Sequence, residues 1–322
     1  MREHDSLYSW TRLFIALLLA TVGNIGMWVV VIVLPDIQQE FKIDRGTASI
    51  PFALTMVGFA IGNWVMGHVV DRYGITKTII LAAMVNTAGY FAVMHVNNVY
   101  LLSILQFFIG LGTAAAFGPL IADTSHWFLK RRGIAVALIA SGNYFSGAIW
   151  PPLFNSTLQS DGWRDVYWIL ALSTVFIMIP LSFLLTKKIS EETARISDAA
   201  SSDKRQNVSI TPKALTILLS IAGIGCCVAM SMPQVHIVAF CIDLGFGPAV
   251  GAEMLSLMLI GGIISRLING LIADKLGGVY TLLIGSTLQC IALFLYLPFD
   301  GLVSLYIVSL VFGLSQGGIV PS

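Results

Sequence analysis

A chain of 322 residues in which 57% are hydrophobic and only 11% are charged does not have the composition of a water-soluble domain, where about a quarter of residues carry charge. Its mean hydropathy of +0.85 agrees, because no aqueous fold buries that much apolar surface. The formal net charge of +1 gives no basis for nucleic-acid binding, which requires clustered Lys and Arg. Composition therefore favours a protein embedded in a lipid bilayer over a soluble enzyme.

The first apolar segment follows Arg2 and covers about residues 11–34. It is too long for the core of a signal peptide and has no clean cleavage site, so we interpret it as a retained membrane span. Further segments follow, each near the roughly 20 residues that a helix needs to cross a bilayer. In chain order the ten predicted spans are 11–34, 47–70, 78–95, 99–122, 134–157, 166–186, 214–241, 249–272, 280–298 and 302 to the end. Because backbone groups in lipid must bond within their own segment, and no segment alternates as a barrel strand does, we predict an all-α membrane protein.

Basic residues predict how these spans are oriented. Of the 18 Lys and Arg residues, one lies well inside a span, and three, Lys42, Arg45 and Arg164, fall on the outside if the amino terminus is cytoplasmic; the other 14 lie on the inside or at the inner end of a span. The positive-inside rule therefore predicts a cytoplasmic amino terminus in a multi-pass protein of the plasma or inner membrane.

The segment 187–213 is the only long polar connection between the predicted spans. Its Ser, Asp, Glu, Lys and Arg content is typical of a solvated linker. We therefore divide the chain into an N-terminal six-helix bundle (1–186), a cytoplasmic linker (187–213) and a partial C-terminal bundle (214–322) that holds helices 7–10.

An internal repeat relates the two bundles. Adding 203 to the residue number carries Gly67 to Gly270, Asp71 to Asp274, Arg72 to Lys275 and Gly74 to Gly277, and the same shift carries Gly110 to Gly313. Helices 2–4 thus correspond to helices 8–10. Because six spans separate the copies, both halves have the same orientation, as in transporters built from two parallel six-helix repeats.

The second copy is shorter than the first. Helix 4 continues past Pro119 into the basic loop at Lys130, whereas the corresponding segment stops at Pro321 and Ser322. We therefore expect a fold of two six-helix repeats in which the second is truncated in helix 10 and lacks helices 11 and 12.

The segment Gly67–Gly74 resembles the loop 2–3 signature of the major facilitator superfamily, and Gly270–Gly277 resembles its second-half copy. In that family the aspartate helps to latch the two bundles on the cytoplasmic side, although Ile75 and Thr76 replace the usual basic pair here. In physical terms, Gly67 would allow close helix approach, Gly74 a turn, and Asp71 a contact to a helix terminus or an arginine. An ordinary polar turn with a capping aspartate is the alternative. From the resemblance and the repeat we predict eight gating residues, namely Gly67, Asp71, Arg72, Gly74, Gly270, Asp274, Lys275 and Gly277.

Three further segments, Trp127–Gly133, Gly162–Arg164 and Arg266–Gly270, resemble the branch of monocarboxylate porters and oxalate/formate exchangers. The resemblance implies that Arg266 meets a substrate carboxylate. Gly262 replaces the acidic residue that the porters carry one turn earlier, and Trp28 lies near the position of their first-helix lysine. A proton-coupled mechanism copied residue for residue is therefore not supported.

Arg266 is also singled out without the family, because it is the only basic residue well inside a predicted span, where an unpaired charge costs several kcal/mol. A guanidinium offers a two-pronged edge to a carboxylate. The alternative is that Arg266 extends to the cytoplasmic face or pairs with a lipid phosphate.

Other polar residues within the spans either join helices or line a substrate cavity. Asn143 and Tyr144 lie among small residues that suit close packing against the other half, and His236 could titrate near neutral pH. Together with Arg266 they form the predicted substrate-binding set, which comprises Arg266, Asn143, Tyr144, His236 and Asn269. Asp123, at the cytoplasmic end of helix 4, is predicted to pair with Arg131 or Arg132 in a structural or gating role.

The chain shows no pattern for a cofactor. Its four cysteines lack metal-binding spacing and are interpreted as small buried hydrophobic residues, and no ATP-binding motif occurs. We predict no cofactor, no catalytic residue, no metal and no enzymatic activity.

Together these features predict a secondary transporter that moves a small organic anion by alternating access. Its expected partners are a small-molecule substrate, a coupling proton or exchanged anion, and the bilayer, with no nucleic acid and a monomeric state. Efflux of neutral or cationic compounds is one alternative, and a non-transporting sensor that keeps the fold is another.

Overall fold

Helices account for nearly all of the chain in the computed structural model, which describes residues 4–190 and 211–317. No strand occurs in these ranges. Within the described residues, eight helical stretches are long and apolar enough to cross a membrane: Leu7–Ile32, Gly46–Tyr73, Ile75–Val93, Val99–His126, Arg132–Phe154, Trp163–Phe183, Lys213–Val238 and Val250–Leu276. Two shorter apolar helices, Gly278–Phe294 and Leu302–Ser315, match the last two predicted spans. The predicted all-α class is confirmed, whereas most of the linker 187–213 and the terminal Pro321 and Ser322 lie outside the described residues.

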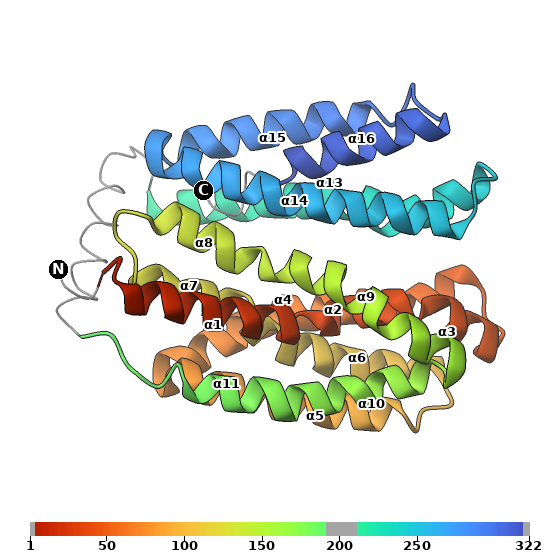
Figure 1. Cartoon of the computed structure of the whole chain (residues 1–322), viewed down its shortest axis with the longest axis horizontal. Coiled ribbons are helices and arrows are strands. Elements are labelled where there is room, and N and C mark those ends of the chain that lie inside the picture. Colours follow the sequence, from red (N-terminus) through yellow and green to blue (C-terminus); the bar gives the residue numbers. More distant parts are fainter. Residues whose placement is uncertain (1–3, 191–210, 318–322) are drawn as a thin grey trace. The chain divides into compact units, whose positions relative to one another are not determined.

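Several spans consist of more than one element. The elements in chain order are α1 (Leu7–Gly23), α2 (Ile25–Ile32), α3 (Leu34–Phe41), α4 (Arg45–Tyr73), α5 (Ile75–Val93), α6 (Val99–Thr113), η1 (Ala114–Ala116), α7 (Gly118–His126), α8 (Arg132–Ala140), α9 (Gly142–Ser160), α10 (Trp163–Ser173), η2 (Thr174–Met178), α11 (Ile179–Phe183), α13 (Pro212–Asp243), α14 (Pro248–Leu276), α15 (Gly278–Phe294) and α16 (Leu302–Ser315) (Figure 1).

Contacts group these elements into two units, which we describe separately. The N-terminal unit comprises Ser6–Ser125 and Phe145–Lys188, and the C-terminal unit comprises Met1–Asp5, His126–Tyr144 and Ile189–Ser322. This grouping differs from the sequence-based division, because α8 packs against α14 and so joins the C-terminal unit. The sequence-based domain limits remain a prediction about topology.

In the N-terminal unit, α4 packs along α6, and α5 lies between α6 and α10. The first span breaks at Asn24, which is fully buried and whose side-chain Nδ2 donates to the carbonyls of Ala20 (2.7 Å) and Ala116 (3.1 Å). Because Ala116 belongs to η1, where the fourth span is itself interrupted, this amide joins two helix breaks. Asn24 therefore links helices, the first of the two roles considered for polar residues within the spans.

An ion pair joins the end of α3 to the start of α10 in this unit. Arg164 at the start of α10 donates from Nη2 to Oε1 of Glu40 (2.7 Å), and Trp163 donates from Nε1 to Oε2 of Glu40 (2.7 Å). The hydrogen bond from Arg164 lowers the pKa of the Glu40 carboxyl, and the bond from Trp163 lowers it as well. Burial acts in the opposite direction and raises this pKa, but its effect is smaller than that of Arg164. This pair attaches the C-terminal end of α3 to the start of the sixth span.

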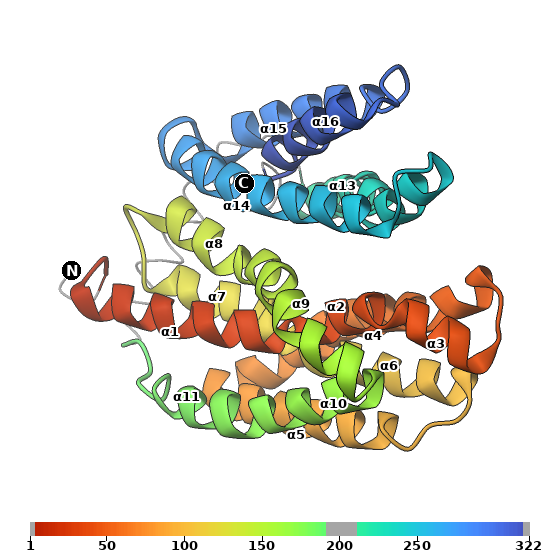
Figure 2. The same ribbon diagram turned by 45° about the vertical axis from the view of Figure 1, so that its right-hand side comes forward.

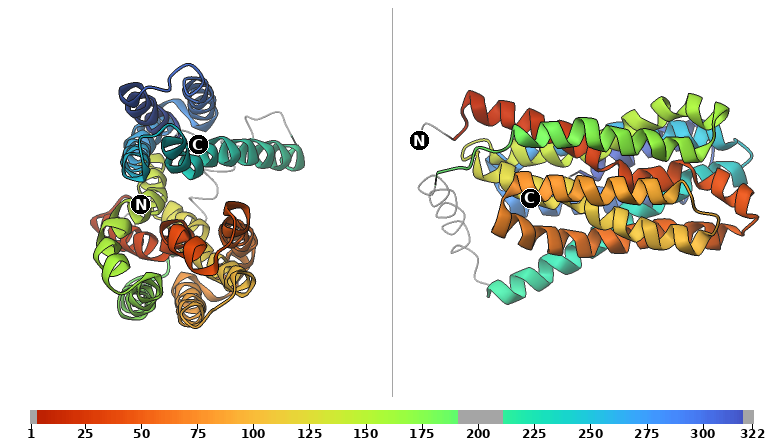
Figure 3. Two further views of the ribbon diagram at one scale, coloured as in Figure 1. Left: turned by 90° about the vertical axis from the view of Figure 1, so that its right-hand side faces the viewer. Right: turned by 90° about the horizontal axis from the view of Figure 1, so that it is seen from below.

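In the C-terminal unit, α14 is the central helix and contacts α8, α13, α15 and α16. Figure 2 shows α15 and α16 side by side above α14. The N-terminal part of α13 extends away from these helices (Figure 3), and only 6% of the apolar window of its span is buried. Of the four cysteines only Cys241 is buried, whereas Cys227 and Cys290 are exposed, so the prediction that all four are buried is wrong.

The 203-residue repeat is present in the backbone. Gly74, between α4 and α5, has φ 82° and ψ 165°, and Gly277, between α14 and α15, has φ 87° and ψ 164°. A positive φ of this kind is open to glycine and strained for other residues. A Cβ added to Gly110 would lie 2.1 Å from the Thr55 oxygen, and one added to Gly313 would lie 2.6 Å from the Met258 oxygen. Since 55 plus 203 is 258, equivalent backbones meet at equivalent glycines in both copies.

Candidate functional site

Arg266 lies on α14 and is among the largest fully buried side chains of the protein, with 1% of its surface exposed. Its guanidinium reaches the segment where α8 gives way to α9: Nη1 donates to the carbonyl oxygen of Ala140, and Cζ lies 3.8 Å from the centre of the Tyr144 ring. The side chain therefore points into the C-terminal unit. In this structure it does not adopt the alternative conformation that extends to the membrane surface.

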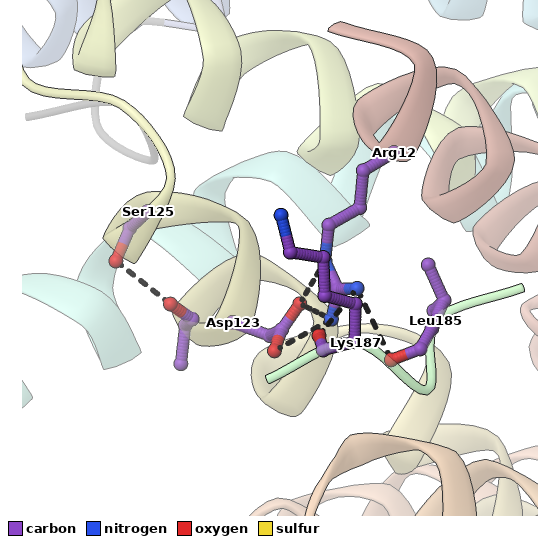
Figure 4. A network of polar contacts seen from close by, with 6 residues as sticks. Arg12, Asp123, Ser125, Leu185 and Lys187 are labelled. Atoms are coloured by element: carbon purple, nitrogen blue, oxygen red, sulfur yellow. Dashed lines mark hydrogen bonds and ion pairs between the residues drawn. The ribbon is translucent and has the colours of Figure 1, made fainter. Parts of the chain in front are cut away.

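A second buried arginine shows what such a side chain normally requires. Arg12 of α1 is 3% exposed, and its Nε and Nη2 both donate to the carboxylate of Asp123 on α7, at 3.1 and 2.8 Å (Figure 4). Its Nη1 donates to the carbonyl oxygens of Leu185 and Lys187, both at 3.1 Å. The structure thus pairs Asp123 with Arg12, a partner that the sequence did not suggest, while pairing with Arg131 or Arg132 remains a prediction.

Arg266 reproduces half of this arrangement. Like Arg12, it places Nη1 on a main-chain carbonyl, but its Nε is buried without a hydrogen-bond partner, and no described carboxylate lies within ion-pair distance. A buried, permanently charged guanidinium whose Nε has no acceptor among the described residues is costly unless an anion meets that atom. The described part of the chain thus contains one buried arginine with a carboxylate and one without.

Gly262 stands where the porter branch that the sequence resembles carries an acidic residue, and two side chains fill the space beside it. A Cβ at Gly262 would lie 2.6 Å from Cε2 of Tyr144 and 2.7 Å from Nε2 of Gln316. These two side chains occupy the space that a carboxylate side chain would need. Gln316 is fixed in turn, since it donates to the Met258 carbonyl (3.0 Å) and accepts from Gln234 Nε2 (2.8 Å).

The other predicted substrate-binding residues are distributed unevenly. Asn143 is 7% exposed and precedes Tyr144, so it lies beside the arginine site. Asn269 is 6% exposed, and its amide donates to the carbonyl (2.8 Å) and hydroxyl (3.3 Å) of Ser265 on its own helix. His236 lines a separate apolar pocket of about 580 Å³ formed by α13, α15 and the turn after α15. Arg266 is not among the residues that line this pocket.

The residues of the first copy of the gating motif, Gly67–Gly74, make few contacts with other described helices in this structure. A Cβ at Gly67 would meet no described atom within 4 Å, so the close approach predicted there is absent from the described residues. Asp71 and Arg72 are exposed, with Arg72 lying 5.4 Å from the ring of the adjacent Tyr73. Gly74 has the predicted role in the turn, as the residue at which α4 ends and α5 begins, and the gating roles of Asp71 and Arg72 stay predictions.

The second copy of the gating motif, Gly270–Gly277, contacts α8. Asp274 accepts hydrogen bonds from the backbone N–H groups of Gly133 (2.7 Å) and Ile134 (3.1 Å), which are unpaired donors in the first turn of α8. Gly270, one turn earlier, leaves room for α8, since an added Cβ would lie 2.6 Å from the Ala137 Cβ. Asp274 thus contacts a neighbouring helix terminus, one of the two contacts considered for its counterpart Asp71. Lys275 is exposed beside it, and Gly277 forms the turn.

A second carboxylate holds the loop before α8. Asp5 accepts from the backbone N–H groups of Leu129 (3.2 Å), Lys130 (3.0 Å) and Arg131 (3.2 Å), while its own N–H donates to the Trp127 carbonyl (3.1 Å). Arg131 thus contributes its backbone here, and Arg132 begins α8. Between them Asp5 and Asp274 accept from the amides of residues 129, 130, 131, 133 and 134.

Sequence reasoning missed several of these residues. Gln234 and Gln316 carry a detectable signal, as polar residues inside apolar spans, but nothing in the sequence shows that their side chains meet. Gly262 is visible only as a departure from a family pattern. Asp5 has no local signal, because its partners are backbone amides more than a hundred positions away. No group of three or more His, Cys, Asp or Glu side chains suited to a metal gathers in the described ranges.

The helices, the repeat and the buried polar site together define a multi-pass α-helical membrane protein with a duplicated architecture. The model of the Major Facilitator Superfamily matches residues 14–322, and the chain belongs to that family.

Two relatives illustrate the range within the family. The chain is 25% identical over 312 residues to monocarboxylate transporter 13 of Rattus norvegicus, covering 95% of this chain and 70% of the relative. It is 24% identical over 291 residues to the agnestins efflux protein AgnL12 of Paecilomyces divaricatus, covering 88% and 64%. The chain thus spans about two thirds of the length of these curated relatives.

Among solved structures, a double tryptophan mutant of XylE superposes with a TM-score of 0.72 at 14% identity, covering 98% of this chain and 81% of that one. The proton:xylose symporter XylE bound to 6-bromo-6-deoxy-D-glucose superposes with a TM-score of 0.65 at 15% identity. At this level of identity the likeness concerns the fold alone.

Proposed function

We propose that this protein is a secondary active transporter that moves a small organic anion, a mono- or dicarboxylate, by alternating access, with Arg266 as the anion anchor. The chain lies in a plasma or inner membrane with its amino terminus in the cytoplasm. The relative named as a monocarboxylate transporter supports the substrate class, and the position of Arg266 in α14 supports the site.

The contrast between Arg12 and Arg266 carries this proposal. Both guanidiniums are buried and both place Nη1 on backbone carbonyls, but only Arg12 has a carboxylate on its Nε–Nη2 edge. A carboxylate substrate would complete at Arg266 the arrangement that Asp123 completes at Arg12. On binding, the carboxylate would replace its contacts with water by two charge-assisted hydrogen bonds to the guanidinium. Because those two donors are coplanar, the site would select a planar carboxylate.

Substitution of Arg266 tests the anchor role. Arg266→Lys keeps the charge but loses the two-pronged edge, and Arg266→Gln loses the charge. Both are expected to raise the KM for lactate or oxalate uptake into proteoliposomes by about tenfold or more, the effect of one charged hydrogen bond. Unchanged uptake in both variants would show that Arg266 does not bind the anion.

Arg12→Lys serves as the matched control. It alters the other buried arginine, which is already paired with Asp123. We expect it to lower the thermal stability of the protein and to leave the KM of the folded fraction unchanged. A parallel rise in KM for both variants would mean that any buried arginine substitution disturbs uptake, and the special role of Arg266 would be lost.

Efflux is the second candidate, favoured by the relative named as an efflux protein at nearly the same identity. Loading vesicles of known orientation on one side and then on the other distinguishes uptake from efflux. An imposed proton gradient, compared with a trapped internal anion, distinguishes proton coupling from anion exchange. Stabilisation by carboxylates without any flux would instead favour a sensor that keeps the fold.

A further inference from the structure

Tyr144 and Ala140 hold Arg266 from the same stretch of chain. Ala140 is the last residue of α8, and Tyr144 lies in the first turn of α9 with no exposed surface. The distance of 3.8 Å between Arg266 Cζ and the centre of the Tyr144 ring is well inside the limit of about 6 Å for a cation facing an aromatic ring. One face of the guanidinium is therefore covered by the ring, and Nη1 is fixed on the Ala140 carbonyl.

Gly262 makes this position of the ring possible. It precedes Arg266 by one helical turn on α14, so both residues point to the same side of that helix. An added Cβ would lie 2.6 Å from Cε2 and 3.0 Å from Cδ2 of Tyr144, closer than nonbonded carbon atoms approach. The Tyr144 ring thus lies against Gly262 and under Arg266, and a larger residue at 262 would displace it.

We propose that Tyr144 is a positioning residue that fixes the plane of the Arg266 guanidinium, and that Gly262 is required because it leaves room for the Tyr144 ring. The proposal deepens the proposed function and rests on it for the role of the anion. With one face and Nη1 occupied, the Nε–Nη2 edge keeps a single direction. That edge includes the buried Nε without a partner among the described residues, so the carboxylate meets donors that are already oriented.

A double-mutant cycle tests the contact without requiring transport. Tyr144→Leu and Tyr144→Phe are compared in the Arg266 protein and in an Arg266→Met background, with Arg266→Gln as the second background if Arg266→Met does not fold. Tyr144→Leu is expected to lower the unfolding temperature by about 3 °C more when Arg266 is present, and Tyr144→Phe, which keeps the aromatic face, to lower it little. Equal losses in both backgrounds would mean that the ring only fills space.

Uptake kinetics test the consequence for the anion. For lactate and oxalate in proteoliposomes, Tyr144→Leu is expected to raise KM about tenfold with a smaller change in kcat, while Tyr144→Phe restores KM to within about twofold. Tyr280→Leu, at a tyrosine that is 66% exposed on α15, is the matched control and should leave KM unchanged. An unchanged KM for Tyr144→Leu would overturn the proposal.

Gly262→Ala provides an independent route to the same effect. This substitution is expected to raise KM as Tyr144→Leu does. The double variant Gly262→Ala with Tyr144→Leu is expected to raise KM little further, because Tyr144→Leu has already removed the ring that Gly262→Ala would displace. Gly225→Ala, where an added Cβ meets nothing within 4 Å, controls for the loss of a helical glycine. If Gly262→Ala behaves like Gly225→Ala, the space argument is wrong. Absence of uptake by the unaltered protein would overturn the proposed function, and the temperature cycle would still decide the role of Tyr144.

Discussion

Single residues within the spans have different roles even where their types are the same. Arg12 and Arg266 are both buried arginines, but the first is bound by Asp123, whereas the Nε of the second has no hydrogen-bond partner among the described residues. The sequence distinguished them only by position, because Arg12 lies near the end of a span and Arg266 well inside one. Burial and the presence of a counter-ion, which require coordinates, separate a structural arginine from a candidate binding arginine.

The pair of Arg12 and Asp123 leads to a stability prediction. Asp123→Asn leaves the 3% exposed guanidinium of Arg12 without its counter-charge, so we expect a loss of about 3 kcal/mol, the usual cost of breaking a buried pair. Thermal unfolding followed by tryptophan fluorescence measures this loss. Combining Arg12→Met with Asp123→Leu removes both charges and should recover most of the stability. If the double variant is less stable than Asp123→Asn, the pair is held by more than its charges.

At the scale of elements, the start of α8 depends on carboxylates from distant parts of the chain. Asp274 accepts from the first-turn amides of α8, and Asp5 accepts from the loop before it. A negative group at a helix N-terminus satisfies unpaired N–H donors and favours the positive end of the helix dipole. The α8 terminus, and with it the Ala140 carbonyl that holds Arg266, is therefore positioned by tertiary contacts.

Removal of the Asp274 carboxylate should be detectable at α8. Asp274→Ala leaves two helix N-terminal amides without an acceptor, and we expect about 1 kcal/mol of destabilisation. Hydrogen–deuterium exchange at residues 132–136 should become faster. Lys275→Ala, at the exposed neighbour, is the control and should leave exchange unchanged. Protection that survives Asp274→Ala would show that other groups cap this helix.

At the scale of the whole molecule, the ten apolar segments and the 203-residue offset agree with the helices and with their turns. The glycines at 74 and 277 have nearly the same backbone angles, and Thr78 and Thr281 each donate to the carbonyl of the turn glycine at 2.9 Å. Repetition of this local geometry follows from repetition of the residues that produce it. The six-plus-six topology that this pattern predicts agrees with membership of the Major Facilitator Superfamily.

The predicted orientation has a direct test. With the native cysteines replaced, His95→Cys between α5 and α6 should react with a membrane-impermeant maleimide on intact cells, because this connection is predicted to face outside. Tyr73→Cys, at the end of α4, should react only after the membrane is permeabilised. Both residues are exposed in the structure, so burial does not explain a difference between them. The reverse pattern of labelling would place the amino terminus outside.

The sequence by itself determined the membrane class, the approximate spans and the repeat, because these depend on hydropathy and periodicity, and it singled out Arg266 as a charge well inside a span. Only the tertiary structure decided which partners surround each charge. The alignment of Tyr144, Gly262 and Arg266, the pairing of Arg12 with Asp123, and the capping of α8 by Asp274 all join residues distant in sequence. Local sequence patterns identify a charged group that is costly to bury, whereas the packing of helices determines which group pairs with that charge.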